Sequence, residues 1–519
     1  VRPSHTSNDG DHFYAATTNQ NQSKLSIDQL FAASVKVTYE AIVNATNIMK
    51  GTWALAIMFI DEPNKLYLSK NGSPLLVGIG DRNDFVIISS EQSGFSNRIN
   101  NYVIIDDNDV IIISKEDGQI KSYATHGNNL TYFPLSNKIM NSIIYEYIQF
   151  TPEPYKHWTI KEIYEQPESV LRVINNGGRI WNDSSVKLGG LERIRNKLLK
   201  INHLIILACG TSYNAGLIGK KYMKMLRIFK YVEVINPSEF DAYDIPNDTN
   251  DVGILCISQS GETRDILNAI KLCKASGIII FSIINSVNST IARKSDAGIY
   301  LNAGREVGVA ATKTFTSQCV ALSLITIWYA QFRNLYENKR CEIISNLRNL
   351  SSNISNLIPN ITTICQNLSK ILKDAHTIFI LGTRRSEPIA YEGALKIKEI
   401  SYIHAEGYPA AEMKHGPIAL IDENMPVIFL APQDGTFSKI LANIQEVKAR
   451  DGIIITLTDR VTDQISELSD YVLEVPNTHK HVFPITSSII LQLLAYNLAL
   501  LRGCDIDQPR NLAKSVTVE

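Results

Sequence analysis

The chain has 519 residues, of which 45% are hydrophobic and 20% charged, and this ordinary globular usage excludes a protein that is mostly disordered. Its 51 lysines and arginines balance 52 aspartates and glutamates, which argues against a broad nucleic-acid-binding or anionic-membrane surface. At roughly 150 residues per domain, the length predicts about three or four domains.

The cysteine pattern and the lengths of the apolar segments bear on the cellular compartment of the protein. Seven cysteines occur, no two of them form a C-x-x-C pair, and their odd number argues against a zinc site or a disulfide framework. We find no run of about 18 uncharged apolar residues and no secretory signal layout at the N-terminus. These features predict a cytoplasmic protein without a membrane span.

The first 125 residues predict a β-rich domain, and residues 126–165 a linker. Short apolar runs that favour strands are separated there by turn residues such as Asn71-Gly72-Ser73-Pro74. The predicted strands are Trp53–Ile60, Lys65–Leu68, Phe85–Ser89, Val103–Ile105 and Val110–Ser114.

The rest of the chain contains an internal duplication, in residues 190–335 and 368–509. Four landmarks recur at offsets of 172 to 175 residues, beginning with the strand-like runs that end in Gly210-Thr211 and Gly382-Thr383. Each unit alternates short apolar strands with helix-length segments, which is typical of an α/β fold with parallel sheets flanked by helices. A helical segment, Glu337–Lys373, joins the two units.

Two loops in the first unit have the composition of a phosphate site. Cys209-Gly210-Thr211-Ser212 and Ser258-Gln259-Ser260-Gly261-Glu262-Thr263 each follow a strand and precede a helix. Hydroxyls and unsatisfied backbone N–H groups at a helix N-terminus suit a phosphate. These residues could equally be ordinary N-caps. Neither loop matches a nucleotide-binding motif.

The segment Tyr391–His404 is predicted to be helical, with Glu392, Lys396 and Glu399 on one face. The usual meaning of Glu392 and Lys396 at this spacing is a solvated salt bridge. Glu399, His404 and the following Lys414-His415 could instead form an acid–base set.

The last ten residues, 510–519, form an irregular tail that contains Lys514. A lysine on such a tail could close over a site and form a Schiff base with a ketone, although most terminal lysines are solvated.

Segments from about residue 155 to the end carry a resemblance. They read ACGTSYNAG (208–216), SQSGETRD (258–265), EVGVAATKTFTSQ (306–318), EGALKIKEISYIHAEG (392–407), KHGPIALI (414–421) and DQPRNLAKSVTVE (507–519). Together they resemble the glutamine–fructose-6-phosphate aminotransferase (isomerizing) family, and KEIYEQPES (161–169) is similar to the start of its isomerase part. The resemblance implies two tandem SIS domains and a transferase that makes glucosamine 6-phosphate, the first step of the hexosamine pathway.

The resemblance also implies site residues, without any metal or cofactor. Lys514 would form an imine with C2 of fructose 6-phosphate, Glu399 would move a proton between C1 and C2, and His415 of a neighbouring subunit would open the sugar ring, so a homodimer or tetramer is implied. Lys396 and His404 would be supporting residues. The substrate would be bound by Thr211, Ser212, Ser258, Gln259, Ser260, Thr263, Val309 and Ala513.

The first part of the chain resembles the later portion of the family's N-terminal-nucleophile glutaminase domain, in GTWALAIMFI (51–60) and NGSPLLVGIG (71–80). That domain needs a first-residue cysteine and T-R-W, H-N-G and D-T-E segments. The sequence as given begins at Val1, its first cysteine is Cys209, and it has none of those segments. We therefore expect a partial glutaminase-like domain in residues 1–125 that does not hydrolyse glutamine.

Two other functions remain open at this stage. SIS domains could bind a sugar phosphate as a sensor without turnover, but a sensor would need none of Lys514, Glu399 and His415. A plain sugar-phosphate isomerase is the third alternative, and it would form no adduct at Lys514.

Overall fold

A computed structural model describes residues 27–50, 53–71, 73, 75–90, 94, 95, 98, 99, 101–107, 109–126, 129–132, 141, 142, 151–475 and 479–514. The chain divides into two compact units, residues 1–143 and 144–519. The predicted linker, residues 126–165, lies partly outside the described residues.

The first unit contains a long helix, α1 (Ile27–Ile48), and two antiparallel sheets. One sheet has the order β1-β2-β6-β7-β8 and the other β4-β3-β5-β9. The strands are β1 (Trp53–Ile57), β2 (Lys65–Asn71), β3 (Leu76–Ile79), β4 (Val86–Ser89), β5 (Asn101–Ile104), β6 (Val110–Glu116), β7 (Gln119–His126), β8 (Asn129–Tyr132) and β9 (Asn141–Ser142).

The β-rich prediction for this unit is confirmed, and all five predicted strands occur with shifted ends. Helix α1 and strands β3, β7, β8 and β9 were not predicted. Leu68, Val77, Val103 and Ile111 form part of a buried core here. Gly78 in β3 weakens the apolar run that would have marked a strand, because glycine contributes no side chain to pack.

The second unit opens with short helices and then repeats one α/β pattern twice. The opening helices are α2 (Trp158–Tyr164), α3 (Gln166–Val173), α4 (Gly189–Glu192) and α5 (Arg195–Leu198). The first repeat comprises β10 (His203–Leu207), α6 (Gly210–Met225), β11 (Tyr231–Ile235), β12 (Val252–Ser258), α7 (Arg264–Ala275), β13 (Ile279–Ile284), α8 (Thr290–Lys294), β14 (Ala297–Tyr300) and α9 (Lys313–Phe332).

The linking helix α10 (Glu337–Leu372) is as predicted, and the second repeat follows it. That repeat comprises β15 (Thr377–Gly382), α11 (Glu387–Ser401), β16 (His404–Pro409), β17 (Pro426–Leu430), α12 (Phe437–Lys448), β18 (Ile453–Thr458), α13 (Asp463–Leu468), β19 (Tyr471–Glu474) and α14 (Phe483–Leu501).

The two repeat sheets have the same topology. Their orders are β11-β10-β12-β13-β14 and β16-β15-β17-β18-β19, and every described strand pair in them is parallel. The predicted duplication and fold class are therefore confirmed. The central strand β12 is buried at every residue, as expected for a sheet covered on both faces.

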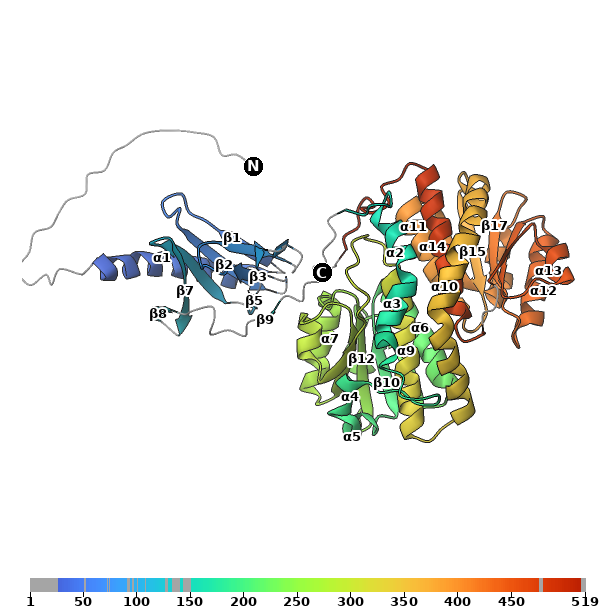
Figure 1. Ribbon diagram of the computed structural model, residues 1–519, viewed down its shortest axis with the longest axis horizontal. Coiled ribbons are helices and arrows are strands. Elements are labelled where there is room, and N and C mark those ends of the chain that lie inside the picture. Colours follow the sequence, from blue (N-terminus) through green and yellow to red (C-terminus); the bar gives the residue numbers. More distant parts are fainter. Residues whose placement is uncertain are drawn as a thin grey trace, which may run out of the picture. The chain divides into compact units, whose positions relative to one another are not determined.

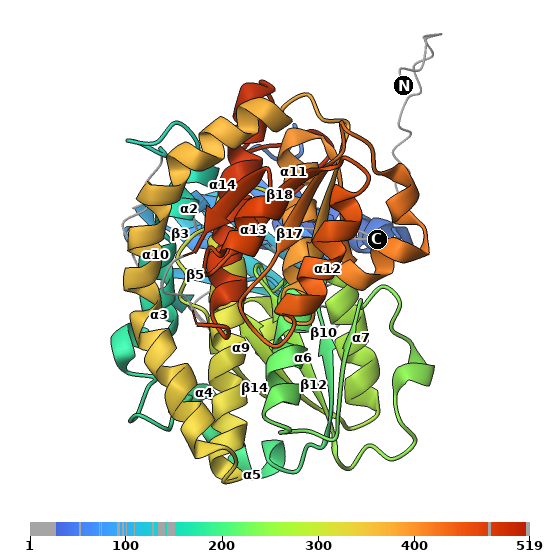
Figure 2. The same cartoon turned by 90° about the vertical axis from the view of Figure 1, so that its right-hand side faces the viewer.

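The two sheets of this unit share a central layer of helices. Figures 1 and 2 show α9, α10, α11 and α14 between the sheets, with α7 outside the first sheet and α12 and α13 outside the second. One continuous apolar core, which includes Leu322, Leu347 and Leu491, runs through this layer. Helices α6 and α11, which follow the first strand of each repeat, pack against each other.

Helix α14 is long and apolar enough to cross a membrane, with a mean hydropathy of 1.5, but 89% of that stretch is buried inside the protein. Threonine, serine, glutamine and asparagine interrupt this stretch, so it is not a continuous run of apolar residues and does not contradict the prediction. The helix packs against α10 and α11, and its Ser487 hydroxyl bonds back to the carbonyl of Phe483. We interpret α14 as a core helix.

Candidate active site

A polar cluster lies where α6 of the first repeat meets α11 of the second. The Thr211 hydroxyl donates to Oε1 of Glu392 at 3.1 Å and accepts from Nζ of Lys396 at 2.9 Å. Asn214, one turn further along α6, donates to Oε2 of Glu392 at 2.8 Å. The duplication thus brings a hydroxyl from one repeat onto the acidic helix of the other.

The predicted solvated salt bridge between Glu392 and Lys396 is wrong. Their Nζ–Oε1 distance is 3.5 Å, and their side chains are only 1% and 2% exposed. The face that carries them packs on α6 rather than facing water. Burial raises the pKa of Glu392 to about 7, against the opposing charge of Lys396. Burial acts to lower the pKa of Lys396, but the charges of Glu399 and Glu392 outweigh it. The pKa of Lys396 is therefore raised above its ordinary value, and the ammonium form is favoured.

Glu399 lies at the open edge of this cluster. Its Oε2 is 2.5 Å from Nζ of Lys396, and its side chain is 22% exposed while that of Lys396 is 2% exposed. A carboxylate that is held by a buried ammonium and is still open to a ligand can accept and return a proton.

Neither histidine of the predicted acid–base set joins the cluster in the contacts that the structure describes. The helix was predicted to reach His404 but ends at Ser401, because Tyr402 adopts a left-handed backbone conformation with φ of 59°. His404 instead begins β16, is exposed, and lies 3.7 Å from Glu406. His415 ends a short 3-10 helix, Ala410–His415, and is also exposed.

The Ser258–Thr263 loop forms a closed turn in front of α7. The Ser258 hydroxyl accepts from the N–H of Gly261 and lies 3.0 Å from the Thr263 hydroxyl, while Ser260 accepts from the N–H of Glu262. The Gln259 carbonyl accepts the N–H groups of Asn285 and Ser286.

Gly261 is required in this turn. Its φ is +69°, and a Cβ there would come within 1.9 Å of the Ser289 hydroxyl oxygen. The loop therefore presents its hydroxyls and the first turn of α7 at the carboxyl end of β12, where ligands bind in sheets of this kind.

The alternative that the loop hydroxyls are ordinary helix N-caps is not supported by their hydrogen bonds. Cys209 caps α6 and Thr263 caps α7, and neither side chain makes a capping hydrogen bond. Ser212 instead accepts from the Gln318 side chain of α9 at 2.9 Å. Burial, with Asp265 nearby, raises the pKa of the Cys209 thiol to about 11, so this cysteine stays protonated at neutral pH.

The tail lysine is not solvated. Nζ of Lys514 donates to Oε2 of Glu306 and to the carbonyl of Gly308, each at 2.7 Å, and its side chain is 25% exposed. The N–H of Val309 bonds to the carbonyl of Asp507, and Ala513 is exposed. The Glu306 charge also raises the pKa of Lys396, so this tail cluster and the α11 cluster lie within electrostatic reach of each other.

Two buried carboxylates, Glu162 and Glu306, lie within electrostatic reach of Lys514. Burial raises the pKa of Glu162 to about 8, and the Glu306 charge adds to the rise. Burial opposes ionisation of Glu306 as well, but Lys514 and the N–H groups of Thr312 and Thr314 hold its pKa below the usual value. Glu306 is therefore the charged partner of Lys514 in this pair.

Several residues of the site were missed from the sequence: Glu162, Glu306, Asn214, Gln318 and Asp507. Glu162, Glu306 and Asp507 occur in the segments that carry the family resemblance, but a buried carboxylate has no local sequence signal that separates it from a solvated one.

In the described part of the chain, no group of three or more His, Cys, Asp or Glu side chains could hold a metal ion.

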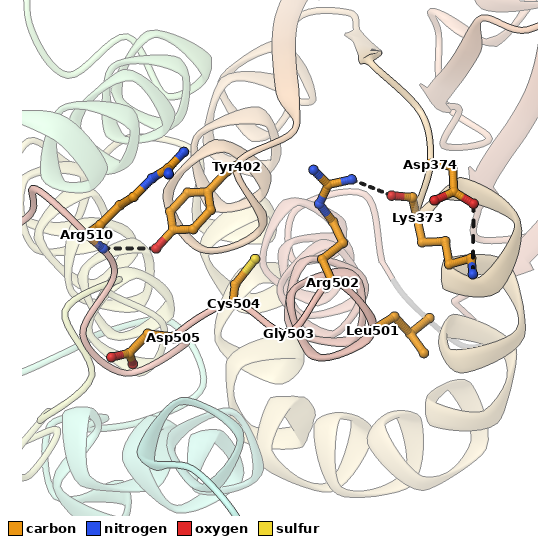
Figure 3. A pocket seen from close by; sticks show the side chains of 9 residues that line it. All are labelled: Lys373, Asp374, Tyr402, Leu501, Arg502, Gly503, Cys504, Asp505 and Arg510. Carbon is orange, nitrogen blue, oxygen red and sulfur yellow. Dashed lines mark hydrogen bonds and ion pairs between the residues drawn. The ribbon is translucent and has the colours of Figure 1, made fainter.

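A separate surface pocket lies at the C-terminal end of α14 (Figure 3). Its lining residues are Lys373, Asp374, Tyr402, Leu501, Arg502, Gly503, Cys504, Asp505 and Arg510. None of the predicted catalytic or binding residues lines it. Its basic side chains are already engaged: Arg502 donates to the carbonyls of Ser401 and Lys373, and Arg510 lies over the Tyr402 ring.

Comparison with known proteins identifies the repeats. A protein-family model described as the SIS domain matches residues 197–327 and 371–502. The C-terminal domain of glucosamine-fructose-6-phosphate aminotransferase from Francisella tularensis superposes with a TM-score of 0.64 at 36% identity, covering 70% of this chain and all of that one. A putative phosphosugar isomerase from Silicibacter pomeroyi matches with a TM-score of 0.56 at 25% identity, covering 68% of this chain and all of that one.

The curated relatives extend the match into the first unit. The glutamine–fructose-6-phosphate aminotransferase (isomerizing) of Chlorobaculum tepidum is 39% identical over 481 residues, covering 92% of this chain and 76% of that protein. A probable enzyme of the same name from Acanthamoeba polyphaga mimivirus is 38% identical over 473 residues, covering 91% of this chain and 74% of that protein. The chain therefore belongs to the glutamine–fructose-6-phosphate aminotransferase (isomerizing) family.

Proposed function

We propose that this chain converts fructose 6-phosphate and ammonia into glucosamine 6-phosphate, as the names of its relatives suggest. One observation carries the proposal: Thr211 of the hydroxyl-bearing repeat contacts the Glu392–Lys396–Glu399 face of the other repeat. That contact joins a phosphate-type cradle to a proton-transfer group in one site.

The sugar phosphate is bound by the first repeat. Ser258, Ser260 and Thr263 supply hydroxyls around the first turn of α7, and Thr211 and Ser212 supply them at the start of α6. A phosphate gains there from unsatisfied N–H groups and from the positive end of the helix dipole. Three further residues complete the proposed substrate-binding set: Gln259 in the Ser258–Thr263 loop, Val309 next to Gly308, and Ala513 next to Lys514 in the tail.

The chemistry begins at Lys514. Its amine, once deprotonated, attacks C2 of the open-chain ketone, and loss of water gives an imine. Ammonia then displaces the lysine, leaving the fructose imine. Glu399 removes a proton from C1, which the imine acidifies, and returns it to C2. The C1 hydroxyl proton passes to the imine nitrogen, and the product is the aldose glucosamine 6-phosphate. Without ammonia, the same C1-to-C2 proton transfer on the C2 ketone gives glucose 6-phosphate.

Lys396 orients Glu399 through their 2.5 Å ion pair. Glu392 and Thr211 in turn hold Lys396. Lys396 therefore supports the base rather than reacting with the sugar.

The exposed His415 supports a shared site in a homodimer or tetramer. We assign it the ring-opening step in a neighbouring subunit, with His404 in a supporting position. The unpaired, C-x-x-C-free cysteines favour a cytoplasmic enzyme.

Formation of glucosamine 6-phosphate from fructose 6-phosphate and ammonium chloride tests the proposal. We expect turnover by the parent chain and a borohydride-trapped adduct at Lys514. Full turnover by Glu399→Gln would refute the assignment of the base. Sugar-phosphate binding with neither product nor adduct would establish the sensor function instead.

A further inference from the structure

Asp507 lies just before the tail of residues 510–519 and ties this end of the chain to the N-terminus of α2. Its Oδ2 accepts the N–H of Trp158 at 2.8 Å, and its Oδ1 accepts both the N–H and the hydroxyl of Thr159 at 2.9 Å. Three donors from two consecutive residues thus converge on one carboxylate. Thr159 is 1% exposed, so this junction is shielded from water on the helix side.

The same helix holds the loop that receives the tail lysine. Glu162, one turn along α2 and 1% exposed, accepts the N–H groups of Val307 and Gly308. Gly308 then offers its carbonyl, and Glu306 its carboxylate, to Lys514. Helix α2 therefore holds both partners of the Lys514 contact, the loop through Glu162 and the tail through Asp507.

Two further contacts reinforce the tail. The Asp507 carbonyl accepts the N–H of Val309 at 3.0 Å, so the tail also bonds directly to the loop. Beyond it, the N–H of Arg510 donates to the Tyr402 hydroxyl at 2.9 Å, and the guanidinium lies over the Tyr402 ring, 4.4 Å from its centroid (Figure 3). Asp507 is the member of this set whose side chain reaches α2.

We infer that Asp507 is a positioning residue that sets the reach of Lys514 by fixing the tail on α2. The inference rests on the proposed role of Lys514 in imine formation. In the described contacts, Asp507 bonds to none of the loop hydroxyls of Thr211, Ser212, Ser258, Ser260 and Thr263, so its loss should affect the placement of the amine more than the binding of the phosphate group.

The test compares Asp507→Ala with Asp505→Ala. Asp505 is an exposed carboxylate two residues before Asp507, and among the described residues it accepts the N–H of Gln508 at 3.0 Å. It therefore controls for the loss of one charge. Because a misplacement of about 1 Å can cost about 100-fold in rate, we expect kcat of Asp507→Ala to fall about 10- to 100-fold. The KM for fructose 6-phosphate should change less than about threefold, and Asp505→Ala should match the parent.

A second pair of variants guards against a folding defect. Thr159→Val removes one donor to Asp507, whereas Thr159→Ser keeps the hydroxyl and should restore the parent rate. Hydrogen exchange at the Val309 amide, bonded to the Asp507 carbonyl in the parent, should accelerate in Asp507→Ala and in Thr159→Val while the melting temperature stays within a few degrees.

Borohydride trapping with fructose 6-phosphate separates the two claims. If the parent is trapped at Lys514 and Asp507→Ala is trapped at the same rate, the positioning role is refuted. If the parent itself gives no adduct, the imine chemistry of the proposed function fails. A drop in trapping confined to Asp507→Ala and Thr159→Val supports the inference.

Discussion

The two SIS repeats have the same strand order and carry different chemistry. In the first repeat, the loop after the central strand β12 is rich in hydroxyls and leads into α7. In the second repeat, the equivalent loop after β17 contains Asp434, which forms an ion pair at 3.2 Å with Arg385. The first loop is held by hydroxyl contacts among its own residues, and the second by an ion pair with the segment that precedes α11.

The acid–base groups show the opposite distribution. Helix α11 of the second repeat carries Glu392, Lys396 and Glu399, while α6 of the first carries Thr211 and Asn214, which satisfy two of them. Duplication allows this division because the two helices meet across the shared core. If the proposed function holds, binding and proton transfer can be altered separately, and the following variants test this.

The largest effect is expected from Glu399→Gln. Loss of a positioned base should lower kcat about 10²- to 10⁴-fold with little change in the KM for fructose 6-phosphate. The assay is glucosamine 6-phosphate formation with ammonium. Glu467→Gln, an exposed carboxylate on α13 of the same repeat, is the control and should keep the parent kcat. A fall in both variants would point to a general charge effect.

Ser258→Ala should mainly weaken binding. Hydrogen bonds to a charged group contribute about 1.5–3 kcal/mol, so we expect the KM for fructose 6-phosphate to rise about 10- to 100-fold. Gln433→Ala changes the equivalent loop of the second repeat and should leave the KM unchanged. Equal effects of the two changes would contradict the division between the repeats.

Glu392→Gln should reveal a pH dependence of stability. Burial raises the pKa of Glu392 from 4.5 to about 7, so its contribution to stability is fully present below pH 4.5 and is lost as the pH rises through about 7. Glutamine does not titrate. The free energy of unfolding should therefore shift in favour of Glu392→Gln by about 1–3 kcal/mol between pH 5 and pH 8.

Urea unfolding of both proteins at the two pH values measures that shift. Glu423→Gln makes the same substitution at an exposed loop residue, and its free energy of unfolding relative to the parent should not change between the two pH values. A constant difference between Glu392→Gln and the parent would mean that Glu392 stays ionised throughout.

The smallest effect is expected from Arg385→Gln. The Asp434 pKa is lowered, because two contacts from Thr436 and one from Arg385 outweigh the effect of burial. The stabilisation is present above the ordinary carboxyl pKa and is lost as the pH falls through the lowered one. We expect a loss of about 1 kcal/mol at pH 7 for this partly buried pair, and no loss near pH 2. A changed KM for fructose 6-phosphate would show that this loop also binds the sugar.

The sequence alone determined the duplication, the parallel sheets and the linking helix. These follow from the apolar periodicity of each segment and from turn residues at its ends, which are local properties. The motif residues at the starts of α6 and α7 were also visible, because a strand followed by small polar residues and a helix forms one continuous stretch of chain. The predicted loop Cys209–Ser212 is wrong, since α6 begins at Gly210 and Thr211 and Ser212 lie in its first turn.

Only the tertiary structure decided which charges are buried. The spacing of Glu392 and Lys396 is the same on a solvated face and on a face packed against α6, and the sequence-based interpretation chose the solvated one. The end of α11 at Tyr402, which separates His404 from the helix, was equally invisible.

The placement of Lys514 between Glu306 and Gly308, with Asp507 fixed on α2, depends on segments hundreds of residues apart. The sequence identified Lys514 as a candidate, but its environment is assembled by packing of the core. Local sequence determines which elements form, whereas the pKa and reach of a side chain depend on the neighbours that folding brings to it.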